Sequence, residues 1–238
     1  MLQIVVGDIK VDVVRKNIKN IHLGVYPPNG RVRISVPLLV KEETIKLFVT
    51  TKISWIRSQQ RKFIEQPRQT PREFKDKESH YYLGTRYLLK IVEINAPPKV
   101  SIQTANTLVL SIRPGSNKEK RKQVLDKWYR EKLRELIPIM IEKWEMVLEV
   151  KVNEFGIKQM KTKWGTCNIE AKRIWINLEL AKKPLHCLEY IIVHELLHLL
   201  ERHHNERYKN LMDTYMPQWR TYRDELNRFP ISHPHWGY

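Results

Sequence analysis

The chain has 238 residues, of which 42% are hydrophobic and 29% are charged, a balance that excludes a disordered polymer and allows one or two globular domains. No apolar run reaches membrane-spanning length, the N-terminus lacks a signal-peptide pattern, and the two cysteines form no C-x-x-C pair. We therefore expect a cytoplasmic protein with reduced thiols and no membrane partner.

Lys and Arg outnumber Asp and Glu by 43 to 26, which gives a net charge of +17. Such an excess favours polyanionic or acidic partners, and contact with nucleic acid through a basic surface is one interpretation. The other interpretation is a solvated basic surface without such a partner, because the charge is spread along the chain and no DNA-reading motif is present.

Residues 1–115 are predicted to form an antiparallel, β-rich region with one long helix. Val32, Ile34 and Val36 alternate with polar residues, a pattern typical of a half-buried strand. Apolar residues then recur at helical spacing over 41–66. Further strands are expected at 2–6, 11–14, 22–25, 81–83, 87–92, 100–103 and 108–112, paired as hairpins where turn residues join them. No internal repeat is evident.

Residues 116–238 are predicted to form a second domain, so the expected fold class is α+β. Ser116 or Asn117 is the expected N-cap of a long amphipathic helix, which Pro138 should kink or split. The other elements expected here are strands at 156–163 and 174–178 and helices that begin near Pro184, near Tyr208 and at Pro217.

Within the helix after Pro184, the run Tyr190–Leu200 is apolar nearly all round, and its polar exceptions are His194, Glu195 and His198. Burying such groups is costly unless they are paired or bind a metal. Residues four apart lie on one helix face, so His194 and His198 can each offer a nitrogen to one ion, while Glu195 can reach a water on it. A lone buried histidine is usually a satisfied core residue, but this H-E-x-x-H pattern is that of two zinc ligands and a general base.

A catalytic zinc site also needs a third protein ligand and an open position. On a straight helix Glu201 would lie about 10 Å along the axis from His194, so the chain must turn back before a third ligand can converge. The polar run after residue 200 supplies that turn. The predicted third ligand is His204, and the alternatives are His203 and, from the last helix, Asp224 or Glu225.

Several motifs follow one another in the C-terminal third, namely Lys163–Cys167 (KWGTC), Ile174–Leu178 (IWINL), Tyr190–His198, His204 and Tyr215–Trp219 (YMPQW). In this order they resemble the YgjP-like metallopeptidase domain family, which is related to the SprT-like proteases. The resemblance implies a zincin-type fold, with the metal helix behind a small antiparallel sheet, and it implies His204 as the third ligand. Glu201 stands where metzincins keep a glycine, so the turn must be built differently.

These observations predict a zinc metallopeptidase that acts on protein or peptide substrates. Zincins commonly bind substrate as an added strand at the sheet edge near the metal helix, and the strand ending at Trp164-Gly165 is the candidate here. In the alternative, Trp164 packs in the core and Gly165 only makes a turn. Two other functions are considered: a basic module that binds nucleic acid or protein and holds a structural zinc, and a SprT-like protease of DNA-associated proteins.

Overall fold

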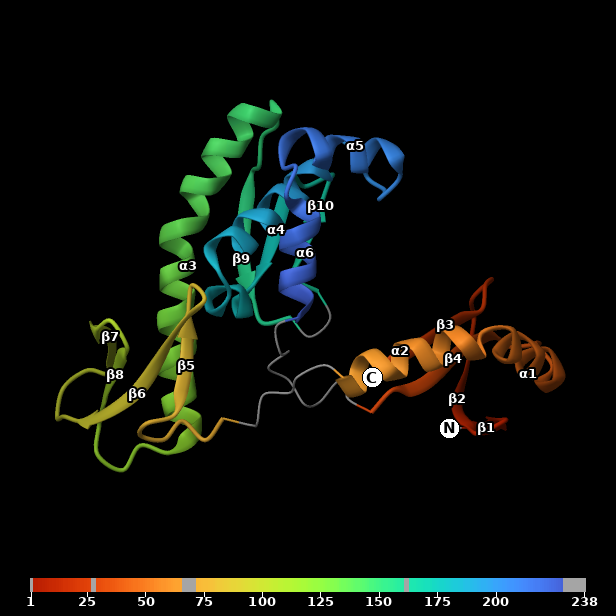
Figure 1. The fold of residues 1–238 in the computed structure, drawn as a ribbon, viewed down its shortest axis with the longest axis horizontal. Helices are drawn as coiled ribbons and strands as arrows, with labels where there is room; N and C mark the ends of the chain where they lie inside the picture. The colour runs from red at the N-terminus through yellow and green to blue at the C-terminus, as the bar shows by residue number, and fades with distance from the viewer. Residues whose placement is uncertain (1, 27–28, 66–71, 161–162, 229–238) are drawn as a thin grey trace. The chain divides into compact units, whose positions relative to one another are not determined.

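The structure, a computed structural model, describes residues 2–26, 29–65, 72–160 and 163–228. This part of the chain contains three small sheets and six α-helices, so the α+β class is confirmed. The chain divides into two compact units, which fall within residues 1–71 and 72–229 and are coloured red to orange and yellow to blue in Figure 1. The boundary predicted between residues 115 and 116 lies inside the second unit.

The first unit is a four-stranded sheet with helices on its apolar face. Its strands are β1 (Leu2–Val6), β2 (Ile9–Lys16), β3 (His22–Tyr26) and β4 (Arg31–Pro37), in the order β1-β2-β4-β3. Val11, Val13 and Ile34 are among the buried residues of its core. Helix α1 (Glu42–Thr51) packs near β1 and α2 (Ile53–Glu65) near β3, and they bring Ile45 and Ile56 to the same core.

The single helix predicted over 41–66 is wrong, because the helix breaks at Lys52. Two threonines precede the break, and their hydroxyls bond back to the helix. The Thr50 hydroxyl donates to the Lys46 carbonyl at 2.8 Å, and the Thr51 hydroxyl donates to the Phe48 carbonyl at 2.7 Å. Such side-chain bonds compete with the backbone ladder and favour a bend, which lets α1 and α2 follow the sheet separately.

The second sheet opens the second unit. It consists of β5 (Ser79–Tyr82), β6 (Thr85–Glu93), β7 (Lys99–Thr104) and β8 (Thr107–Ile112), in the order β5-β6-β8-β7. This order repeats the first sheet strand for strand: the first and third pairs are antiparallel hairpins, and the central pair is parallel. In both units the fourth strand leads directly into helix.

The prediction of purely antiparallel sheets in the N-terminal half is therefore wrong. The sheets are mixed, because β2 lies parallel to β4 and β6 lies parallel to β8. The chain also contains a repeat of topology that the sequence does not reveal. Turn residues specify each hairpin locally, but the side-by-side pairing of two hairpins depends on long-range contacts that leave no short-range signal.

Helix α3 (Lys118–Leu148) follows the second sheet and is the longest element. Asn117 caps it by accepting a hydrogen bond from the Lys120 N–H at 2.9 Å, as predicted. Pro138 does not split the helix, which continues for ten residues beyond it. Loss of one backbone bond at Pro138 is offset by burial of Ile137 and Ile141 on the core side.

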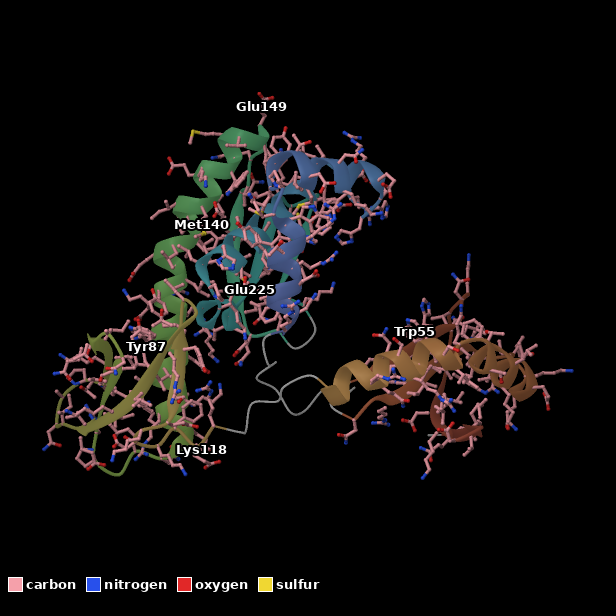
Figure 2. The ribbon with its side chains drawn as sticks, viewed as in Figure 1. Trp55, Tyr87, Lys118, Met140, Glu149 and Glu225 are labelled. Atoms are coloured by element: carbon pink, nitrogen blue, oxygen red, sulfur yellow. The ribbon has the colours of Figure 1, made fainter. Side chains whose placement is uncertain are left out.

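Figure 1 shows α3 running from the second sheet at one end to the remaining elements of this unit at the other, and Figure 2 marks Lys118 and Glu149 at these two ends. One continuous core consequently contains Leu110 of β8, Leu133 of α3 and Ile192 of the helix that is predicted to carry the metal ligands. The second sheet and the predicted catalytic region are thus parts of one unit.

The third sheet has the order β10-β11-β9. Its strands are β9 (Glu154–Lys158), β10 (Gly165–Asn168) and β11 (Arg173–Asn177), and a 3₁₀ turn η1 (Leu178–Lys182) follows. The strand predicted over 156–163 ends at Lys158, and Gly165 begins a separate strand. The sheet is not purely antiparallel, because β9 runs parallel to β11.

Three helices complete the second unit: α4 (Leu185–Leu197), α5 (Glu206–Tyr215) and α6 (Trp219–Arg228). Helix α4 packs against α3 on one side and against β10 and β11 on another, and α6 packs against α4. Leu188, Ile192 and Leu196 of α4 are fully buried. In the described residues, no helix combines the length and the apolar character needed to cross a membrane.

Candidate metal centre

Helix α4 and the loop after it bring three histidines together. The imidazole nitrogens of His194, His198 and His204 offer one atom each, and these atoms all lie within 4.8 Å of one another. The Nε2 atoms of His194 and His204 are 3.1 Å apart. Burial and the two neighbouring imidazoles lower the pKa of His194 to about 3, and burial also lowers the pKa of His198. Neutral imidazoles are the form that binds a metal.

The loop between α4 and α5 reverses the chain without a glycine. Glu201 is not among the residues with a left-handed backbone, so this turn needs no glycine there. The Glu201 carbonyl lies 3.1 Å from Nδ1 of His198, and its carboxylate accepts the His203 N–H at 3.2 Å. Asn205 then caps α5 by accepting the Tyr208 N–H at 2.9 Å. Because Nδ1 of His198 is engaged in this way, Nε2 is the nitrogen that faces the other imidazoles.

Tyr208 is the residue at this site that the sequence indicated only as part of a helical stripe. Its ring stacks on His198 with centroids 5.0 Å apart and meets the rings of His194 and His204 edge-on at 5.4 and 4.8 Å. Its hydroxyl donates to the His194 carbonyl at 3.1 Å. The buried ring thus forms one wall of the cluster and restricts all three imidazoles. The available signal was its position four residues after His204 on a capped helix.

Glu195 lies on α4 next to these histidines and is 4% exposed. Burial raises its pKa to about 8, although the Lys163 ammonium acts in the opposite direction. Its carboxyl group is held against Gly165 of β10, where an added Cβ would lie 2.5 Å from Oε1. A Cβ at residue 165 would collide with the carboxyl group in this position. The close approach of Glu195 to β10 therefore favours glycine there.

Strand β10, which carries Gly165, is an edge strand of the third sheet and packs against α4. Asn177 fixes its start: the side-chain amide donates to the Lys163 carbonyl at 2.7 Å, and its backbone N–H donates to the Trp164 carbonyl at 2.9 Å. The Trp164 side chain is half-buried and packs against the core of this unit. The structure therefore combines both interpretations of Trp164-Gly165, packing for Trp164 and an edge position for Gly165.

The alternative third ligands lie elsewhere. His203 is not part of the cluster. The Asp224 carboxylate pairs with Arg223 at 2.9 Å, and the Glu225 carboxylate lies 2.6 Å from Nε2 of His186. Glu225, His186 and Cys187 form a second group with mutually close ligand atoms, but its His and Glu already satisfy one another.

A cleft of about 1010 Å³ surrounds the histidine cluster. It is lined by Glu195, by β10 and by residues from α6, so the third sheet and α6 both contribute to its wall. Trp164 and Gly165 both line it. Tyr215, Tyr222 and His203, which could be considered for oxyanion binding, are not among its lining residues.

An edge strand, a buried glutamate and three convergent imidazoles in one cleft are features of metallopeptidase domains. The sequence profile of the YgjP-like metallopeptidase domain family matches residues 19–229, and the chain belongs to that family.

A search of solved structures finds similarity to the metallopeptidase zymogen jannalysin of Methanocaldococcus jannaschii. The two share 21% identity with a TM-score of 0.35, over 38% of this chain and 92% of that one. A comparison with curated proteins gives no match.

Proposed function

We propose that the protein is a zinc-dependent peptidase in which His194, His198 and His204 hold the metal and Glu195 is the general base. The observation that carries this proposal is the convergence of three imidazoles beside one buried carboxyl group in a single cleft. Three nitrogen ligands suit zinc and leave a coordination position for water or substrate. A structural site would instead be closed by a fourth protein ligand, and the described residues group only these three here.

A bound zinc ion would supply Lewis-acid polarisation of the scissile carbonyl and would acidify a water molecule. The chain's own residues do the remaining work. Glu195 accepts the proton of the attacking water and passes it to the leaving nitrogen. Its carboxylate must be ionised to begin this cycle, and the nearby cationic charge of Lys163 favours that form. Gly165 allows the carboxylate to lie directly against β10, because it has no Cβ at this place.

The substrate is proposed to add to β10 as an extra strand. An edge strand presents unpaired backbone N–H and C=O groups, so an extended peptide can bind there largely independently of its side chains. Gly165 and Trp164 would then lie next to the scissile bond, because β10 begins at the Glu195 carboxylate. Asn177 acts as a positioning residue through its bonds to the segment before β10.

The test compares the zinc-loaded wild type with Glu195→Gln and His204→Ala, using zinc content by elemental analysis and cleavage of an unstructured protein. Glu195→Gln should keep one zinc per chain and lose activity by a factor of about 10² or more. His204→Ala should lose most of its zinc. Arg134→Glu, an exposed change on α3, is the control and should alter neither. Full activity in Glu195→Gln would reject the glutamate as base.

A second candidate rests on the distribution of charge. Residues 1–71 contain 13 Lys and Arg but only 5 Asp and Glu, an excess that favours a polyanion. In this version the peptidase acts on DNA-associated proteins. Duplex DNA should then stimulate cleavage at low salt, and the stimulation should fade as salt rises. If DNA does not change the rate of cleavage at low salt, the action on DNA-associated proteins is rejected and the general peptidase remains the proposal.

A further inference from the structure

The charged residues around the cleft are unbalanced in favour of cations. Besides Glu195, the charged lining residues are Lys163, Arg202, Arg223 and Glu170. The three cations come from three different elements: Lys163 precedes β10, Arg202 lies in the loop between α4 and α5, and Arg223 lies on α6. They therefore approach the cleft from separate directions.

Two of these cations have no acidic partner among the described residues. Neither Lys163 nor Arg202 forms an ion pair there, and both side chains are exposed. Arg223 differs, because its guanidinium bonds to Asp224 at 2.9 Å and lies over the Trp219 ring at 5.1 Å. Arg202 thus keeps its full charge for a molecule in the cleft, whereas the charge of Lys163, which also acts on the Glu195 carboxyl group, and that of Arg223 are partly compensated.

Few acidic residues line the cleft. Glu195 is reserved for the chemistry in the proposed function, which leaves Glu170, an exposed residue in the turn between β10 and β11. A metal ion bound by the histidines would add further positive charge. Lining a cleft with one sign of charge concentrates ligands of the other sign and repels those of the same sign.

We propose that this cleft selects peptide segments that carry Asp or Glu close to the scissile bond. The inference rests on the proposed peptidase function and names its substrate class. A substrate that lies along β10 passes Lys163 at the start of the strand, and its other side faces the Arg202 loop and α6. Each exposed charge pair changes affinity by about two- to fivefold, so Lys163 and Arg202 together give a preference of about tenfold.

The experiment uses the zinc-loaded full chain and three fluorogenic peptides with one central sequence flanked by Glu, by Ser or by Lys. The value of kcat/KM should fall in the order Glu, Ser, Lys, by about tenfold from the first to the second at low salt. The difference should reside mainly in KM and should shrink as ionic strength rises. Equal kcat/KM values for the three peptides would overturn the proposal.

Arg202→Glu should reduce the ratio of kcat/KM for the Glu peptide over the Ser peptide to near one, and Arg223→Glu should reduce it less. Arg202→Gln serves as a milder variant, and zinc content shows that the metal loop is intact. Arg134→Glu makes the same change of net charge on the exposed face of α3. If that control lowers the ratio as much as Arg202→Glu does, the preference comes from overall charge and the cleft assignment is wrong.

Binding of the same peptides to Glu195→Gln separates this proposal from the peptidase function. Tighter binding of the Glu peptide with no turnover by the wild type would reject the peptidase and keep the selective cleft. Turnover without any difference in binding or kcat/KM among the peptides would keep the peptidase and reject the selectivity.

Discussion

The first and second sheets have the same strand order and the same strand directions, yet they end in different environments. The first is covered by its own two helices and forms a separate core. The second shares its core with α4, α5 and α6. One topology thus serves once as a self-contained unit and once as the base of a candidate active site.

The difference arises in the helix that follows each sheet. After β4 the helix breaks at Lys52, so α1 and α2 stay with their own sheet. After β8 helix α3 does not break, and its second half extends past the sheet, where Ile137, Ile141 and Trp144 continue the same core. At about 1.5 Å per residue, continuity of a 31-residue helix carries packing over roughly 46 Å. A helix break therefore decides whether such a sheet stands alone.

The largest effect is expected from truncating one buried residue in each unit. Leu133 on α3 and Ile45 on α1 are both fully buried. Leu133→Ala should lower the free energy of unfolding of the second unit by about 2–5 kcal/mol, and Ile45→Ala should do the same to the first. Hydrogen exchange followed by mass spectrometry measures each unit in each variant. If Ile45→Ala also lowered the protection of α4 against hydrogen exchange, the separation of the two cores would be contradicted.

A smaller effect should distinguish the first hairpin turns of the two sheets. Gly7 and Gly84 both have positive φ, 62° and 83°, so alanine adds about 1–2 kcal/mol of backbone strain at either. A Cβ on Gly84 would also meet Cγ of Pro184 at 2.9 Å, whereas nothing lies within 4 Å of one on Gly7. Gly84→Ala should therefore cost about 1–3 kcal/mol more, measured by urea unfolding. Equal losses would mean that the second hairpin does not depend on its contact with α4.

The two units should differ in stability at acid pH because of His80. This histidine is buried in β5 of the second sheet, where the first sheet has an apolar residue. Burial, helped by Arg72, lowers the pKa of His80 to about 4, although Glu78 acts against this. The unfolded chain then binds a proton below pH 6.5 that the folded chain does not, so stability is present above that pH and is lost as pH falls towards 4. We expect a loss of about 1–3 kcal/mol in the second unit between pH 7 and 4.5.

Hydrogen exchange at several pH values, with wild type and His80→Gln, checks this expectation. The variant should reduce the pH dependence of the second unit, where the lowered pKa values of His194 and His198 act in the same direction, and leave the first unit unchanged. A second unit whose stability stays level down to pH 4.5 in the wild type would show that His80 is protonated when folded.

The smallest effect concerns the helix starts. Asn117 caps α3 with its side chain, whereas Lys41 at the same place before α1 has an extended backbone and makes no such bond. Lys41→Asn should stabilise the first unit by about 0.5–1 kcal/mol, and Asn117→Ala should destabilise the second by about 1 kcal/mol. Urea midpoints measured for each unit test both. No gain in Lys41→Asn would mean that the α1 backbone cannot accept the cap.

The sequence predicts much of the histidine site and of the local elements. Spacing alone places His194 and His198 on one helix face and Glu195 beside it, because helix geometry is fixed. The convergence of His204 was also expected from the need to turn, and the structure brings its ring to the others. Alternating apolar residues and turn signals indicated most strands in both sheets.

What the sequence did not reveal depends on distant contacts. The break at Lys52 comes from threonine hydroxyls and from packing on the sheet, which override helical spacing. The separate strand at Gly165 is fixed by bonds from Asn177, twelve positions later. Tyr208 belongs to an ordinary helical stripe until the histidines surround it. The repeated topology survives in three dimensions although the two sequences differ.

The unbroken helix α3 also has a consequence for biosynthesis. The core residues that the structure describes in the first unit lie between Ile4 and Ile56, so this core can form while the ribosome is still adding the second sheet. The metal ligands, the edge strand and α6 all come after α3, and Leu226 near the end of α6 is still part of the shared core. A nascent chain can therefore carry a folded core of the first unit before the residues that line the cleft have been translated.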